Sequence, residues 1–293
     1  MRKTQWIVAI LAWIGVVAAS ALAAAPSYDA IYVFGDSYCD VGNIFLATGG
    51  AEPGPPYYNG RFSNGPIWIE HVAGGLGLPM TPSLAGGTDY AFGGAWATAP
   101  QPIPGGVIPS VPEQVGIYLA SHGGKADPNA VYVIEGGGND ILDATGGSPD
   151  ALGFKIATAI AESELLLRRA GARHFVIPNL FDVGLIPAGQ ANAVFDHAAV
   201  VAANEYLNKL LALEDFLEGV HILRLDVYSL LNQLEKDPTH YGFSNVTTPC
   251  LTTTICSDPD HTFFWDTHHP TVFGFDLFAT TMQVVLAQQA NHH

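Results

Sequence analysis

The stretch "IYVFGDSYCDVGN", residues 31–43, decides how the chain begins its fold. Its first half is an apolar, β-branched and aromatic run, which predicts a buried strand, and Gly35 then permits a sharp turn. The turn presents Ser37, which is either a helix cap or a nucleophile. We expect Asp40 and Asn43 to brace the start of a helix that follows. Whether Ser37 is a nucleophile depends on the partners that the rest of the chain supplies.

Apolar runs alternate with helical patterns along the rest of the chain. Strands are predicted at 30–35, 88–94, 130–137, 174–179 and 220–227. Helices are predicted at 66–77, 111–123, 149–172, 192–219 and 271–289, and Pro/Gly-rich loops at 50–66 and 99–110. The strands are short continuous apolar runs, as expected where helices cover both faces of a sheet. The alternation predicts an α/β fold, a three-layer α/β/α sandwich around a central, mostly parallel five-stranded sheet.

The amino terminus has the layout of a secretory signal peptide. Two basic residues precede the apolar run "WIVAILAWIGVVAA", and small residues follow it. This pattern predicts a signal peptide over 1–23, cut after Ala23, and a secreted or periplasmic protein. An uncleaved membrane anchor is the alternative, but the run is short for a span of about 20 residues. We expect residues 26–290 to form one domain with no stable membrane span.

The net charge argues against one class of binding partner, and the three cysteines allow a disulfide. The formal charge of −16 repels polyphosphate, so nucleic acid is not an expected partner. Three cysteines in an exported chain allow three single pairings, and Cys250 and Cys256 close the short loop "CLTTTIC". We predict that disulfide, with Cys39 as the odd thiol. Three reduced, buried thiols remain the alternative. The oligomeric state stays open.

A base for Ser37 is found far along the chain, in "FWDTHHPT" at 264–271. Asp266 and His269 are three residues apart, so the carboxylate can hold one imidazole nitrogen and leave the other free for the serine. His268 is the competing base, but its spacing from Asp266 directs it to another side. The sequence thus predicts a Ser37–His269–Asp266 triad.

Attack on an ester carbonyl also needs donors for the developing negative charge. The backbone N–H of Ser37, at the start of a predicted helix, is one candidate. The N–H of Gly94 and the side-chain amide of Asn139, in "GGGND", are the others. These residues follow three predicted strands, so they should share one edge of the sheet.

At this point the residues resemble the GDSL esterase/lipase family of the SGNH hydrolase superfamily. The matching blocks are "FGDSYCDVGN", "NGRFSNGPIWIEHVAGGLGLP", "DYAFGGA", "GGGND" and "DTHHPT", in family order over about 30–285. The resemblance implies a flavodoxin-like SGNH hydrolase fold and carboxylic-ester hydrolysis without a cofactor. We expect structural support for the site from Gly35, Asp36, Asp40, Asn43 and Asp140.

The chain also departs from the family pattern. Tyr38 and Cys39 stand where Leu and Ser are common, which affects the expected shape of the acyl pocket. Asp89 replaces a frequent asparagine, which leaves open whether Gly93 or Gly94 donates to the oxyanion.

Other chemistries fit the sequence less well. Cys39 should face away from the base of Ser37, and the His/Asp-rich segment 258–269 has no zinc-protease motif, so we expect no metal. The predicted substrate is a small-molecule, lipid or carbohydrate ester. An acyltransferase or phospholipase of the same fold, or a non-catalytic binding module, is the alternative function.

Overall fold

The computed structural model describes residues 28–103, 106–213 and 218–290, and a parallel sheet forms its centre. The strands are β1 (Ile31–Phe34), β4 (Val131–Ile134), β5 (His174–Pro178) and β6 (His221–Leu225), in the spatial order β1-β4-β5-β6. All four residues of β4 are buried, because helices cover both faces of the sheet. The predicted signal peptide, 1–23, lies outside the described residues.

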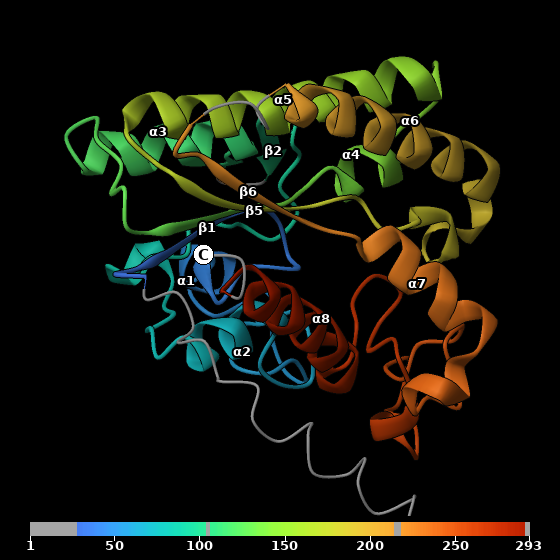
Figure 1. The fold of residues 1–293 in the computed structure, drawn as a ribbon. Coiled ribbons are helices and arrows are strands. Elements are labelled where there is room, and N and C mark those ends of the chain that lie inside the picture. Colours follow the sequence, from blue (N-terminus) through green and yellow to red (C-terminus); the bar gives the residue numbers. More distant parts are fainter. Residues whose placement is uncertain (1–27, 104–105, 214–217, 291–293) are drawn as a thin grey trace, which may run out of the picture.

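Helices enclose the sheet as the predicted three-layer arrangement requires. Figure 1 shows α3, α5 and α6 above the sheet and α2 and α8 below it, so the α/β/α prediction is confirmed. The helices described are α1 (Asn43–Ala47), α2 (Trp68–Gly75), α3 (Val111–Ser121), α4 (Gly138–Leu142), α5 (Pro149–Ala170), α6 (Ala193–Ala212), α7 (Val227–Lys236) and α8 (Val272–Ala290). Short 3₁₀ turns are η2 (Ser83–Ala85), η3 (Val183–Leu185), η4 (Gly189–Asn192), η5 (Pro238–Tyr241) and η6 (Pro259–His261).

Local signals explain where several helices begin. The Ser110 N–H donates to the Glu113 carboxylate at 2.9 Å, which is half of a capping box at the start of α3. Ser148 accepts from the Ala151 N–H before α5, and Pro149 fits the first turn. None of the described helices is long and apolar enough to cross a membrane.

The prediction of a fifth strand at 88–94 is wrong, because the described sheet has four strands. The segment does run beside β1: the Val33 N–H donates to the Thr88 carbonyl, and the Tyr90 N–H to the Val33 carbonyl. However, the segment does not extend the sheet with its other N–H groups. The Ala91 N–H, for example, donates to the side chain of Asp89 in the same segment. Only an isolated bridge results, and the chain then turns away at Gly94, whose φ is +80°.

Two other elements differ from the sequence expectation. The predicted loop 99–110 contains a hairpin, β2 (Gln101–Ile103) paired antiparallel with β3 (Gly106–Ile108). The predicted strand 220–227 stops at Leu225, because Asp226 caps α7 by accepting from the Ser229 N–H at 3.0 Å. The sequence prediction had no helix at α7.

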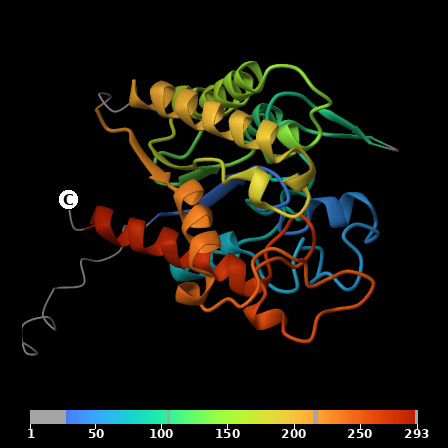
Figure 2. The same cartoon turned by 90° about the vertical axis from the view of Figure 1, so that its right-hand side faces the viewer.

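The loops that carry the candidate site lie at the carboxyl ends of the strands. Figure 2 views the molecule from the side toward which β6 runs in Figure 1. Segments far apart in sequence meet there, since the ring centres of Phe62 and His269 are 5.0 Å apart. This is the edge at which parallel α/β sheets bind ligands.

Candidate active site

The chain leaves β1 through a turn that places Ser37 at the sheet edge. The N–H groups of Cys39 and Asp40 donate to the Asp36 carbonyl, so the chain folds back tightly around the serine. A Cβ on Gly35 would lie 2.8 Å from the Glu135 carboxyl and 3.3 Å from the Glu135 carbonyl, so glycine permits the close approach of these two strand ends. The expectation that a helix starts at Ser37 is wrong, because the helix α1 begins only at Asn43.

Ser37, His269 and Asp266 form a hydrogen-bonded chain. The Ser37 Oγ lies 2.8 Å from His269 Nε2, and His269 Nδ1 lies 2.8 Å from Asp266 Oδ2 and 3.0 Å from Oδ1. Since Nδ1 faces a carboxylate, that nitrogen carries the proton and Nε2 accepts from the serine hydroxyl. All three residues are less than a tenth exposed. The serine proton therefore has a base already oriented to receive it.

Three donors besides the imidazole hold the Asp266 carboxylate. The N–H groups of His268 and His269 both donate to Oδ1 at 2.7 Å, and the Tyr57 hydroxyl donates to Oδ2 at 2.7 Å. Burial alone would raise the pKa of Asp266. The charge of His269 and the donated hydrogen bonds outweigh burial and hold the pKa well below its usual value.

His268, the competing base, points elsewhere. Its Nδ1 lies 2.9 Å from the Thr267 hydroxyl, and its carbonyl accepts from the Tyr38 hydroxyl at 2.6 Å. Burial and the neighbouring charge of His269 lower the pKa of His268. His268 contributes to the site through its backbone, since its N–H donates to Asp266 and its carbonyl accepts from Tyr38.

The candidate oxyanion donor Asn139 links the turn before Ser37 to the loop after Gly94. Asn139 Nδ2 donates to Asp36 Oδ2 at 3.2 Å and to the Ala95 carbonyl at 3.1 Å. The Gly93 N–H donates to Asp40 Oδ2 at 2.8 Å and is therefore occupied. Among the described residues, the N–H groups of Ser37 and Gly94 have no protein acceptor. The geometry thus favours Gly94 over Gly93.

Buried acids hold the loops around these donors. The Asp40 carboxylate accepts from the N–H groups of Gly42, Asn43, Ile44 and Gly93. The Asn43 amide donates to the carbonyls of Asp89 and Ala91 at 2.8 and 2.9 Å.

A second buried acid, Asp140, supports the loop that follows Gly94. Its carboxylate accepts from the N–H groups of Ala97 and Thr98 at 2.7 and 3.0 Å. Asp40, Asn43 and Asp140 thus position the loops that carry Gly94 and Asn139.

The cysteines divide as the sequence suggested. Cys250 and Cys256 form a disulfide, and the adjoining Leu251 N–H donates to the Trp265 carbonyl, beside Asp266. Cys39 is completely buried, and burial, followed by the charges of Glu135 and Asp36, raises its pKa well above the usual value. A buried neutral thiol is not a nucleophile. The described residues contain no cluster of three His, Cys, Asp or Glu side chains suited to a metal.

Residues 31–280 match the family described as GDSL-like Lipase/Acylhydrolase. The chain belongs to this family. The GDSL family supports ester hydrolysis or acyl transfer as the class of chemistry, and its match covers all the candidate site residues.

Relatives of this GDSL chain include two bacterial proteins. Thermolabile hemolysin of Vibrio parahaemolyticus is 30% identical over 266 residues, which cover 82% of this chain and 60% of the hemolysin. Phosphatidylcholine-sterol acyltransferase of Aeromonas hydrophila is 30% identical over 254 residues, covering 84% of this chain and 72% of that protein. The chain thus spans less than two thirds of the hemolysin.

A solved structure agrees at the level of the fold. The lipolytic protein of the G-D-S-L family from Veillonella parvula superposes with a TM-score of 0.51 at 16% identity, over 87% of this chain and 96% of that one.

Three residues of the GDSL site were not found from the sequence. Tyr57 donates to Asp266, and Gln114 both accepts the Gly35 N–H at 2.8 Å and donates to the Gly35 carbonyl at 2.9 Å. Glu135 lies against Asp36, whose pKa burial raises to about 6. Burial and the Asp36 charge raise the pKa of Glu135 well above its usual value. Only Glu135 carried a signal, as a lone acid ending an apolar strand.

Proposed function

We propose that the chain hydrolyses carboxylic esters by nucleophilic attack of Ser37. The observation that carries this proposal is the continuous hydrogen-bonded chain from Ser37 Oγ through the His269 ring to Asp266, with 2.8 Å at both links. A serine hydroxyl is a weak nucleophile, and an oriented imidazole removes its proton as the bond to the carbonyl carbon forms.

The proposed reaction proceeds in two steps. Ser37 Oγ attacks the acyl carbon while His269 Nε2 takes the proton, and the imidazolium then protonates the departing alcohol. A water molecule attacks the resulting acyl-enzyme by the same route in reverse and releases the acid. Asp266 stays ionised throughout, because its three other donors and the imidazolium stabilise the charge.

The tetrahedral oxyanion is proposed to bind to the N–H groups of Ser37 and Gly94 and to Asn139. Both amide hydrogens of Asn139 are already used, and the contact to Asp36, at 3.2 Å, is the longer. We propose that this contact is exchanged for the oxyanion as charge develops. Each such donor contributes about 10²–10³ to the rate in acyl-transfer enzymes.

Replacing the nucleophile tests the proposal. Ser37→Ala should lower kcat for p-nitrophenyl butyrate by about 10⁴–10⁶-fold, with an unchanged fold by circular dichroism. Cys39→Ala is the matched control from the same turn and should keep wild-type turnover. Wild-type turnover in Ser37→Ala would refute the assignment, and a folded wild type without activity on any ester would favour a non-catalytic binding module.

Acyl transfer to an alcohol is the second candidate. The acyl-enzyme is common to hydrolysis and transfer. The observation that favours transfer is the resemblance to the Aeromonas hydrophila acyltransferase over 84% of this chain. Product analysis with an ester and an added alcohol separates the two: transfer gives a new ester, and hydrolysis gives only the free acid.

A further inference from the structure

A small, mostly apolar cavity borders the loops that carry the proposed site. It has a volume of about 30 Å³ and opens among the residues that follow β4, β5 and β6. Its apolar walls include Leu180, Phe181, Val183, Leu225, Val227 and Phe278. A volume of this size holds about two water-sized groups. The proposed mechanism uses none of these side chains.

The cavity adjoins both sides of the reacting centre along the chain. Tyr38 and Gly138 are among its walls, and they are the immediate neighbours of Ser37 and Asn139. Ser37 and Asn139 themselves do not line it. Tyr38 lines the cavity, and its ring centre lies 5.8 Å from that of His269, so this side chain borders both the cavity and the proposed base.

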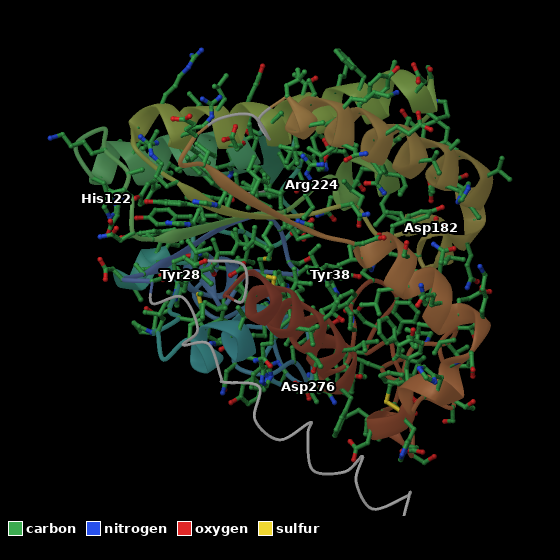
Figure 3. The ribbon with its side chains drawn as sticks, viewed as in Figure 1. Tyr28, Tyr38, His122, Asp182, Arg224 and Asp276 are labelled. Carbon is green, nitrogen blue, oxygen red and sulfur yellow. A yellow bond between two sulfur atoms is a disulfide. The ribbon has the colours of Figure 1, made fainter. Side chains whose placement is uncertain are left out.

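Several contacts fix the Tyr38 ring in this dividing position. Its ring stacks on Phe181 with centroids 4.8 Å apart and meets Phe275 edge-on at 5.7 Å. The hydroxyl donates to the His268 carbonyl at 2.6 Å. Figure 3 shows Tyr38 between the carboxyl edge of the sheet and helix α8.

We propose that Tyr38 limits the acyl chain by closing this cavity, so that the enzyme prefers short acyl groups. An alkyl chain extending from the carbonyl carbon at Ser37 needs an apolar surface to cover it. The Tyr38 ring forms one wall of the apolar space next to the site, and extending that space toward Ser37 requires displacing a side chain held by stacking and a hydrogen bond. This inference rests on the proposed esterase function and names its substrate class.

The one acid in the cavity wall does not oppose an apolar occupant. Glu135 lines the cavity, and burial together with the Asp36 charge raises the pKa of its carboxyl well above the usual value. A raised pKa widens the pH range in which the carboxyl is neutral, and a neutral carboxyl costs far less to leave against hydrocarbon than a carboxylate. The cavity is thus suited to an alkyl chain once the ring is removed.

A series of p-nitrophenyl esters from acetate to decanoate tests the proposal on the full chain. In the wild type, kcat/KM should fall for chains longer than butyrate. In Tyr38→Leu, the ratio of kcat/KM for octanoate to kcat/KM for butyrate should rise about tenfold. This is the rate gain expected when two more methylene groups of the acyl chain are buried in the transition state. Tyr38→Phe keeps the ring but loses the hydroxyl, so it should keep the wild-type ratio.

A second variant checks that the cavity itself receives the chain. Val227 also lines the cavity, so adding Val227→Phe to Tyr38→Leu should fill the cavity and cancel the gain for octanoate. If Tyr38→Leu does not fold, Tyr38→Met makes the same test with a flexible side chain.

The possible outcomes separate the two proposals. An unchanged octanoate-to-butyrate ratio in an active Tyr38→Leu or Tyr38→Met variant would overturn the role of Tyr38. A rise of the octanoate-to-butyrate ratio in Tyr38→Phe as large as that in Tyr38→Leu would also overturn the role of the Tyr38 ring. Failure of the esterase function looks different: a folded wild type would then hydrolyse none of the esters and would not react with a fluorophosphonate.

Discussion

At the residue scale, the orientation of Asp266 is the feature on which the proposed chemistry depends. A carboxylate that accepts two backbone N–H groups and the Tyr57 hydroxyl cannot rotate away from His269 Nδ1 without losing them. The backbone donors come from "DTHHP" itself, within three residues of Asp266, whereas the sequence spacing predicts only the contact of Asp266 with the His269 ring. Tyr57 lies 209 residues away in sequence, so only the folded structure identifies it.

Replacing Tyr57 by Phe should weaken this arrangement without removing the triad. A hydrogen bond to a charged group contributes about 1.5–3 kcal/mol, and we expect kcat/KM to fall about tenfold. The pKa of Asp266 should also rise toward its usual value. Because a lowered pKa contributes stability that is lost as pH falls through it, Tyr57→Phe should lose stability at a less acidic pH.

Acid unfolding and ester kinetics measure the two effects of Tyr57→Phe. Tyr58→Phe, at a neighbouring residue whose side chain is 40% exposed, is the matched control and should behave as wild type. Equal effects from both variants would mean that the loop, and not the hydroxyl, supports Asp266.

At the element scale, Gln114 joins helix α3 to the end of β1. Its amide satisfies both backbone groups of Gly35 and also donates to the Pro109 carbonyl at 3.2 Å. Gly35 precedes the turn that carries Ser37, so this link fixes the height of the nucleophile above the sheet. The side chain is fully buried, which makes each of these bonds costly to lose.

Gln114→Met keeps the volume of the side chain but leaves the Gly35 N–H and carbonyl unpaired. Each unpaired buried group costs about 1–3 kcal/mol, so the free energy of unfolding should fall by roughly 2–4 kcal/mol. Urea unfolding measures this change. Ile117→Gln, at an exposed position of the same helix, is the control and should change it by less than about 0.5 kcal/mol. A loss no larger than in the control would contradict the role of Gln114.

Elements with a strong apolar pattern were predictable from the sequence, and elements set by competing hydrogen bonds were not. The runs that form β1, β4 and β5 are largely apolar and buried, because helices cover both faces of the sheet, whereas the edge strand β6 buries only Leu223 and Leu225. The segment 88–94 has the same pattern, and its Tyr90 N–H donates to β1, but the N–H groups of Asp89, Ala91 and Gly93 donate to the Thr81 carbonyl and to the side chains of Asp89 and Asp40. Asp226 ends β6 and caps α7, two roles that the apolar pattern alone does not separate.

At the scale of the whole molecule, several acids are buried with little opposing charge. Their pKa values are raised, with burial as the largest cause, and for two of them the value reaches about 6. The acids with raised pKa are Asp36, Asp40, Asp89, Glu135, Asp140 and Asp196. The sequence showed the excess of acidic residues but not which of them the fold buries.

Folding stability should therefore rise as the pH falls from 8 to about 5. An acid with a raised pKa contributes stability that is fully present below its unfolded pKa and is lost as pH rises through its folded pKa. For Asp36, a folded pKa of about 6 implies a loss of roughly 1–2 kcal/mol over this range. At about 2–4 °C per kcal/mol, Tm should be several degrees higher near pH 5.

Glu135→Gln should flatten this dependence, because it removes one of the acids whose pKa is raised and keeps the shape of the side chain. Thermal melts between pH 5 and 8 measure the slope, and Glu162→Gln, at an exposed position, should leave it unchanged. A wild-type Tm that is independent of pH, or that rises toward pH 8, would contradict the assignment of these buried acids.

The central claim is that Ser37 becomes acylated during turnover. The most direct measurement is tandem mass spectrometry of the peptide containing residues 31–43 after rapid acid quench with a slowly hydrolysed ester. We predict an acyl group on Ser37 in the wild type and none in His269→Ala. An acyl group on Cys39, or sustained ester turnover in the wild type with Ser37 never modified, would contradict the proposed mechanism.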